Sequence, residues 1–189
     1  MLTALSRLLR TKGYDVKPYP SPQDFLADHD ATVPGCALLD VSMPGLDGLA
    51  LQEALTADGV HRPVIFITGV GDVPTSVRAM KAGAIDFLTK PVDESDLLAA
   101  IERAAKRDAE ARQSHTEVES IQARVRTLTP RELEVLTHVV AGRLNKQTAG
   151  DLGIAEKTIK VHRARVMQKM GVRTLVDLVR LAEKAGISQ

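Results

Sequence analysis

The sequence has little cysteine and no long hydrophobic run. Cys36 is the only cysteine among 189 residues, which excludes an internal disulfide and a zinc site built from several cysteines. No apolar stretch approaches the roughly 18 to 20 residues that a membrane-spanning helix needs. The first residues carry Arg7, Arg10 and Lys12 where a signal peptide would be apolar. We therefore expect a cytoplasmic protein that does not contact the membrane.

The chain also lacks internal repeats, low-complexity tracts and the charge excess of a disordered protein. With 44% hydrophobic and 26% charged residues, its composition is that of an ordered globular protein. Charge is distributed unevenly, because residues 1–105 hold 9 Lys/Arg against 14 Asp/Glu, whereas residues 127–189 hold 11 against 6. The basic end indicates a polyanionic partner there, although an ordinary solvated face has a similar composition.

Residues 1–105 alternate between helical and strand-like segments. YDVKPY, CALLD, PVIFIT and IDFLTK favour strands, and helices are expected after Ser21-Pro22, over 46–57, over 74–82 and after Asp93. This alternation predicts an α/β domain with a mainly parallel sheet. Residues 106–126 are polar apart from a narrow apolar seam and predict a helical linker, which leaves residues 127–189 as a second, all-α domain.

Three polar side chains end three of the predicted strands, namely Asp40, Thr68 and Lys90. The carboxyl ends of parallel strands meet at one edge of a sheet, so these side chains are expected to converge. An aspartate nucleophile, a hydroxyl and an ammonium together suit phosphoryl transfer. Three unrelated strand-end residues are the alternative, which is weakened because each of them ends a strand.

Two enzyme classes fit the same region less well. An aspartate-based phosphohydrolase commonly has a second acid two residues after the first, where this chain has Ser42. Gly69-Val70-Gly71 could begin a dinucleotide-binding loop, but the third glycine position holds Pro74 and no Walker lysine follows. We therefore expect no enzyme acting on small molecules.

The C-terminal segment has the spacing of a helix-turn-helix. Ala149, Gly153 and Ile159 supply a small contact residue, a glycine for a tight turn and a core anchor. In the helix that follows, Val166 and Met170 share a buried arc with Ile159. The opposite arc carries three cations and no acid, and comprises Lys157, Lys160, Val161, Ala164, Arg165 and Gln168.

That outer arc favours a recognition helix over a plain surface helix, which normally mixes both signs of charge. Lysines can reach guanine edges or phosphates, and an exposed valine can contact a thymine methyl group. His162 lies at the edge of the buried arc and is expected to be packed and hydrogen-bonded. Arg163 lies beside that arc and has no assigned role.

LTPRELEVLTHVVAG, NKQTAGDLGIAEKTIKVHRARVMQKMGV and TLVDLVRLAEKAG closely resemble the LuxR-type helix-turn-helix domain of FixJ-like (LuxR/NarL-type) response regulators. The resemblance implies that Lys160, Val161 and Ala164 face the major groove of DNA. It also implies that residues near the phosphates are Asn145, Lys146 and Thr158.

LLDVSMPGLDGL, VIFITG and DFLTKP resemble the receiver domain of response regulators, which has a flavodoxin-like doubly wound sheet. The resemblance implies that Asp40 is the phosphoacceptor, that Thr68 and Lys90 form the signalling pair, and that Phe87 is the switch aromatic. It further implies a cis peptide at Lys90-Pro91 and a magnesium ligand at the backbone carbonyl of Ser42.

One part of the receiver pattern is absent from this sequence. Receivers begin with a hydrophobic strand ending in paired acids that hold Mg²⁺, whereas this sequence starts inside the first helix. Asp40 and the Ser42 carbonyl alone form an incomplete site, so weak Mg²⁺ binding is expected. In the receiver strand order 2-1-3-4-5, the missing strand would leave both neighbours with unpaired backbone groups. We expect a truncation that removed about 15 residues, enough for a short strand and its turn.

The sequence predicts a DNA-binding transcriptional regulator of a two-component system, controlled by phosphorylation of Asp40. Its expected partners are duplex DNA, a sensor histidine kinase and RNA polymerase, and we expect a homodimer on DNA. The alternative is a phosphorylation-independent regulator whose first domain serves only dimerisation or docking. Asp40, Thr68 and Lys90 favour the first hypothesis, and the absent acidic pair favours the second.

Overall fold

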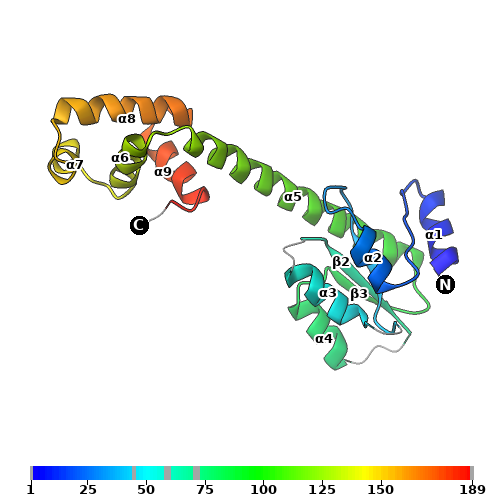
Figure 1. Cartoon of the computed structure of the whole chain (residues 1–189). Coiled ribbons are helices and arrows are strands. Elements are labelled where there is room, and N and C mark those ends of the chain that lie inside the picture. The colour runs from blue at the N-terminus through cyan, green and yellow to red at the C-terminus, as the bar shows by residue number, and fades with distance from the viewer. Residues whose placement is uncertain (1, 44–45, 58–60, 70–72, 188–189) are drawn as a thin grey trace. The chain divides into compact units, whose positions relative to one another are not determined.

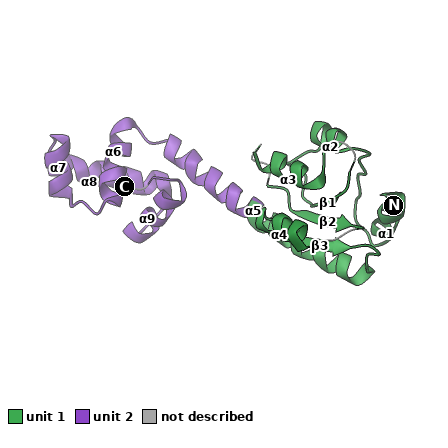
Figure 2. Cartoon of the chain, turned by 90° about the horizontal axis from the view of Figure 1, so that it is seen from below, with its two compact units in different colours: residues 1–111 green, residues 112–189 purple. Residues whose placement is uncertain are grey.

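The computed structural model of the chain describes residues 2–43, 46–57, 61–69 and 73–187. The chain divides into two compact units, residues 1–111 and residues 112–189 (Figure 2). Within the described ranges, no helix combines the length and the apolar character that crossing a membrane requires.

The first unit contains a parallel sheet with helices packed on it (Figure 1). Its strands are β1 (Ala37–Asp40), β2 (Val64–Thr68) and β3 (Asp86–Thr89), arranged in the order β1-β2-β3. Asp40 pairs with Ile67, and Thr68 pairs with Thr89. All five residues of β2 are buried, as expected of the central strand of a parallel sheet.

Helices cover both faces of this sheet. They are α1 (Leu2–Thr11), α2 (Pro22–Asp28), α3 (Gly48–Ala57), α4 (Val73–Lys81) and the first part of α5 (Glu94–Arg126). Phe66 of β2 packs in one core with Leu55 of α3 and Ala79 of α4. Ile65, on the opposite face of β2, packs with Leu9 of α1 and with α5. The predicted doubly wound α/β architecture is therefore confirmed.

Local sequence explains where the second helix begins. The Ser21 hydroxyl accepts a hydrogen bond from the Asp24 amide at 3.1 Å, and Pro22 occupies the first helical position. A capping oxygen satisfies an amide that has no partner within the helix, and proline brings a preset φ without wasting a donor. The predicted start of this helix is confirmed.

The predicted strand at residues 14–19 is wrong. This segment forms no strand in the structure, and β1 pairs only with β2 among the described residues. Instead, the Arg10 side chain donates a hydrogen bond to the carbonyl of Val16 at 2.9 Å. A strand requires hydrogen bonds to a neighbouring strand, so apolar alternation without such a neighbour leaves an irregular segment.

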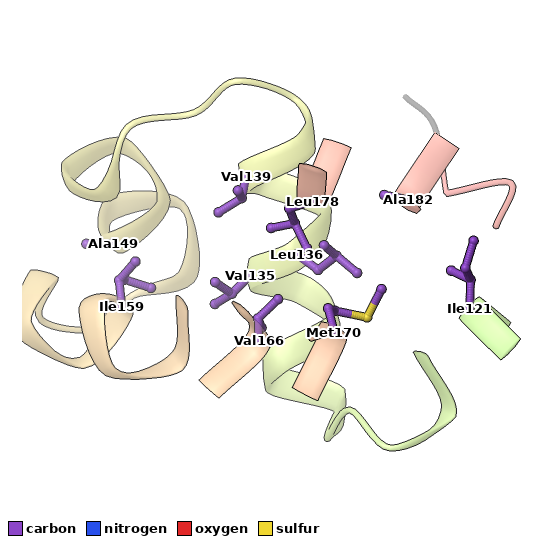
Figure 3. Packing of buried hydrophobic residues seen from close by; sticks show 10 residues of the cluster. All are labelled: Ile121, Val135, Leu136, Val139, Ala149, Ile159, Val166, Met170, Leu178 and Ala182. Atoms are coloured by element: carbon purple, nitrogen blue, oxygen red, sulfur yellow. The ribbon is translucent and has the colours of Figure 1, made fainter. Parts of the chain in front are cut away.

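The second unit is all helical, as predicted. It contains α5 from Arg112 onward, α6 (Pro130–Val140), α7 (Asn145–Leu152), α8 (Glu156–Met170) and α9 (Leu175–Lys184). Its core, shown in Figure 3, combines residues from all five helices: Ile121, Val135, Leu136, Val139, Ala149, Ile159, Val166, Met170, Leu178 and Ala182. Ile121 is the contribution of α5, which runs unbroken for 33 residues.

The turn between α7 and α8 has the predicted helix-turn-helix chemistry. Gly153 has φ +64° and caps α7, where its N–H donates to the carbonyls of Ala149 and Gly150. Ala149 of α7 and Ile159 of α8 are buried in the same core. Glycine suits this position because a side chain strains a left-handed backbone.

Candidate phosphorylation site and DNA interface

The structure brings Asp40, Thr68 and Lys90 to the carboxyl edge of the sheet. Asp40 ends β1, Thr68 ends β2, and Lys90 follows β3 directly. Lys90 Nζ lies 2.5 Å from Asp40 Oδ2, and the Lys90 amide donates to the Thr68 carbonyl at 2.7 Å. The Asp40 and Lys90 side chains are 22% and 26% exposed, so the ion pair is accessible from solvent, whereas Thr68 is buried.

The backbone after β1 supports the Asp40 carboxylate. Asp40 Oδ1 accepts a hydrogen bond from the Ser42 amide at 3.1 Å. Together with Lys90, this contact gives each carboxylate oxygen a donor of its own. The side chain is therefore held at the strand end with its negative charge partly balanced.

Gly48 is a positioning residue that the sequence reasoning did not single out. A Cβ at this position would lie 2.4 Å from the Asp40 carbonyl oxygen and 2.9 Å from Phe66 Cε1. Only glycine therefore allows the first turn of α3 to approach the end of β1 this closely. No sequence pattern predicts such a close approach, because it arises from tertiary packing.

Phe87, the predicted switch aromatic, lies on β3 beside the site. Its ring is half-buried, and its centroid lies 6.1 Å from that of Phe66 with an interplanar angle of 44°. The peptide between Lys90 and Pro91 is cis, as the sequence predicted.

The described residues around Asp40 do not fit a Mg²⁺ site. Receiver domains generally bind Mg²⁺ for phosphorylation. Mg²⁺ favours octahedral oxygen coordination and usually takes one or two carboxylates in addition to phosphate. Here Asp40 is engaged with Lys90 and with the Ser42 amide. In the described part of the chain, no three acidic, histidine or cysteine residues come together as a metal site.

The DNA-binding candidates on α8 form an outward-facing surface. Lys157, Lys160, Val161, Ala164 and Arg165 are all exposed, whereas Thr158 is half-buried. Val161 remains 49% exposed, so its methyl groups are accessible to a partner. The opposite face is buried as predicted, because Ile159, Val166 and Met170 have no exposed surface.

The predicted outer arc contains no acid, but an acid lies beside its edge. Glu156, at the first position of α8, places Oε1 3.2 Å from Lys160 Nζ. Residues four apart lie on the same side of a helix, so the acid and the lysine share one face. The sequence reasoning left Glu156 out because, at 100° per residue, it lies beside the outer arc and not within it.

One further contact positions a predicted DNA-binding residue. Arg163, which had no assigned role, donates from Nη1 to Asn145 Oδ1 at 3.1 Å and so links α8 to the start of α7. Lys146, the next residue of α7, is exposed. His162 was predicted to be hydrogen-bonded, but its buried Nδ1 has no partner among the described residues.

A half-buried ion pair joins α8 to α6. Lys169 Nζ lies 2.6 Å from Glu132 Oε2 and donates to the Thr127 carbonyl at 2.9 Å. Glu132 is itself buried and forms a capping box with Thr129. The Lys169 ammonium, followed by the Thr129 amide, lowers the pKa of Glu132 from 4.5 to about 2. The outward surface of α8 is thus carried by a firmly anchored helix.

Known families match both units. The response regulator receiver domain matches residues 1–102, and the luxR family of bacterial regulatory proteins matches residues 126–182. Nodulation protein W from Bradyrhizobium diazoefficiens is 44% identical over 188 residues, which cover 100% of this chain and 83% of that protein. Transcriptional regulatory protein FixJ from the same organism is 42% identical over 187 residues, which cover 99% and 91%.

A solved response regulator has a similar structure. The response regulator StyR superposes with a TM-score of 0.83 at 46% identity, over 97% of this chain and 93% of that chain. Fold and sites together define a two-domain regulator in which a receiver precedes a helix-turn-helix. The chain belongs to the two-component response regulators that have a LuxR-type DNA-binding domain, and its relatives are transcriptional regulators.

Proposed function

We propose that phosphorylation of Asp40 controls DNA binding by this response regulator. The observation that carries the proposal is the 2.5 Å ion pair between Asp40 and Lys90 at the carboxyl edge of the sheet. It places a partly exposed carboxylate beside a cation that can balance the added phosphoryl charge. A sensor histidine kinase is the phosphoryl donor that membership of this family implies.

The proposed chemistry is a direct phosphoryl transfer. A carboxylate oxygen of Asp40 attacks the phosphorus of the donor, the bond from phosphorus to the donor's nitrogen or oxygen breaks, and the donor group leaves with that electron pair. Lys90 then pairs with the phosphoryl oxygens. Thr68 of β2 and Phe87 of β3 are proposed as the residues that respond to the new charge.

A second candidate function is regulation without phosphorylation. The observation that favours it is that both carboxylate oxygens of Asp40 are already bonded, Oδ2 to Lys90 and Oδ1 to the Ser42 amide, and that the described part of the chain holds no cluster of three acidic, histidine or cysteine residues. On this proposal, the first unit serves dimerisation or docking only, and the ion pair with Lys90 is a permanent structural contact.

The proposed DNA interface is the outer surface of α8 together with the start of α7. Lys160, Val161 and Ala164 are proposed to meet base edges in the major groove. Proposed phosphate contacts come from Asn145, Lys146, Lys157, Thr158 and Arg165. The regulator is proposed to bind as a homodimer and to act on RNA polymerase.

Phosphotransfer to the full chain separates the two candidates. Acetyl phosphate is added with and without Mg²⁺, and intact mass shows whether one phosphoryl group has been gained. Asp40→Asn should abolish any gain in mass. Asp47→Asn is the control and should not, because Asp47 caps α3 by accepting a hydrogen bond from the Ala50 amide. An unmodified wild-type chain under both conditions, with unaltered DNA binding, would support regulation without phosphorylation.

A further inference from the structure

Glu156 is an acid on the helix that carries the proposed DNA-contacting cations. It is the sole acidic residue in the sequence of α8, where it occupies the first position. Its side chain is 45% exposed, and that of its partner Lys160 is 64% exposed. Both side chains of the pair are therefore accessible, at the edge of the outer arc of α8.

The helix dipole favours an acid in the first turn of α8, but the ion pair with Lys160 itself adds little to stability. An exposed ion pair contributes little to folding, because water and salt screen the attraction and both side chains lose freedom. Next to DNA, a carboxylate is unfavourable because it meets the negative charge of the phosphates. An acid at this place on a DNA-reading helix therefore needs a compensating role.

The other cations of α8 fall into two groups. Arg163 is bound to Asn145, and Lys169 is bound to Glu132 and Thr127, so both serve the packing of the unit. Lys157 and Arg165 have no ion pair or hydrogen bond within the described ranges, and both are exposed. Lys160 differs from all four, because it is exposed and yet forms an ion pair with a residue of its own helix.

Restraint changes what a lysine can recognise. Lysine has a flexible stem and three rotatable donors, so a free ammonium pairs with any phosphate within reach. If one N–H is held by Glu156, two remain to meet acceptors such as O6 and N7 of guanine. The first residues of a recognition helix are those that approach base edges, which is where this pair lies.

We propose that Glu156 is a specificity-determining residue that positions Lys160 toward a base edge and withholds it from the phosphates. The proposal rests on the proposed function of α8 as the DNA-reading helix. It predicts that loss of the carboxylate strengthens binding to arbitrary DNA and weakens discrimination between sequences.

The experiment uses the full chain, with Glu156→Gln, Lys160→Ala and the double variant. Each protein first selects its preferred motif from a random duplex pool. Its affinity is then measured for the duplex selected by wild type and for a scrambled version. Glu156→Gln should bind the scrambled duplex more tightly and lower the ratio of the two affinities by about tenfold. Its selected motif should lose definition at the base pair that Lys160→Ala also relaxes, and the double variant should match Lys160→Ala.

Glu183→Gln is the matched control, because it removes an exposed acid of equal charge from α9. It should leave the selected motif and the affinity ratio unchanged. If Glu156→Gln selects the wild-type motif with the wild-type affinity ratio, the positioning role is overturned. It is also overturned if the double variant loses definition at two different base pairs, one for each substitution. Failure of the wild-type chain to select any motif would instead overturn the proposed function itself, and this inference with it.

Discussion

At the scale of single residues, Gly48 and Glu132 show two ways in which this chain holds its functional groups in place. Gly48 does so by having no side chain, since any Cβ would collide with the backbone of Asp40. Glu132 does so by charge, since it is buried and joins the cap of α6 to Lys169 of α8. Both residues lie outside the surfaces proposed to bind partners, and both can be tested separately.

Gly48→Ala should destabilise the first unit by about 1–3 kcal/mol, because the strand end must shift to admit the methyl group. It should also slow phosphoryl transfer to Asp40 while leaving all charges unaltered. Urea unfolding and intact mass after acetyl phosphate treatment measure the two effects. Gly69→Ala is the control, because its Cβ would meet nothing closer than Lys90 Cδ at 3.8 Å. Equal effects of the two substitutions would contradict the role given to Gly48.

Glu132 should make the second unit sensitive to acid. Its pKa is about 2 in the folded chain against 4.5 ordinarily, so it stabilises the fold above pH 4.5, and that stabilisation is lost as the pH falls toward 2. Glu132→Gln should lower the free energy of unfolding at pH 7 by about 1–3 kcal/mol. The deficit relative to wild type should shrink at pH 3.

Urea titrations at the two pH values check this prediction. Glu134→Gln removes an exposed carboxylate that pairs with Arg131 at 2.6 Å on the same helix, and should cost less than about 1 kcal/mol at either pH. A deficit in Glu132→Gln that does not change between pH 7 and pH 3 would show that its charge is not what matters.

At the scale of elements, α8 separates base contacts from phosphate contacts. Lys157→Ala and Arg165→Ala should each weaken binding to all duplexes alike and reduce the salt dependence of binding by about one counterion. Lys160→Ala and Val161→Ala should alter the selected motif instead. Lys146→Ala, at the start of α7, should behave like Lys157→Ala and Arg165→Ala, because Lys146 is also proposed to contact phosphates. Salt titrations and motif selection give the answer, and an unchanged motif in Lys160→Ala would contradict the assignment.

Elements whose signals are local could be predicted from the sequence. Ser21-Pro22 marks the start of α2, and the spacing of Ala149, Gly153 and Ile159 marks the helix-turn-helix, because caps and tight turns depend on a few neighbouring residues. The convergence of Asp40 and Lys90 also follows from sequence, because strand ends in a parallel sheet share an edge.

Features that depend on distant neighbours could not be predicted. Residues 14–19 have strand-like composition, yet a strand forms only beside another strand. The approach of Gly48 to Asp40 and the contact of Arg163 with Asn145 arise from tertiary packing. Glu156 is different, because its spacing of four residues to Lys160 was visible in the sequence, although Glu156 lies outside the predicted outer arc.

At the scale of the whole molecule, the second compact unit includes the last part of α5. Ile121 is buried in its core, the Arg124 side chain donates to the Met170 carbonyl at 3.0 Å, and Glu117 pairs with Lys184 at 2.6 Å. The DNA-binding unit therefore uses residues that precede the segment 127–189.

A fragment of residues 112–189 should accordingly be more stable than one of residues 127–189. The loss of Ile121 from the core alone should lower the free energy of unfolding by about 2–5 kcal/mol. Thermal unfolding followed by circular dichroism measures the difference, and binding to a duplex at low and high salt shows whether each fragment retains function. Fragments of equal stability would show that α5 contributes nothing to this core.

The same feature decides where such regulators can be recombined. A hybrid protein could join the receiver of one regulator to the DNA-binding domain of another by a cut directly before the helix-turn-helix. Cutting this chain at residue 127 would give the transplanted domain a foreign residue in place of Ile121, which is only 2% exposed. A crossover between Ala111 and Arg112, inside the continuous helix α5, keeps Ile121 together with the buried side chains that it contacts. In this chain, the unit of exchange therefore begins in the middle of a helix.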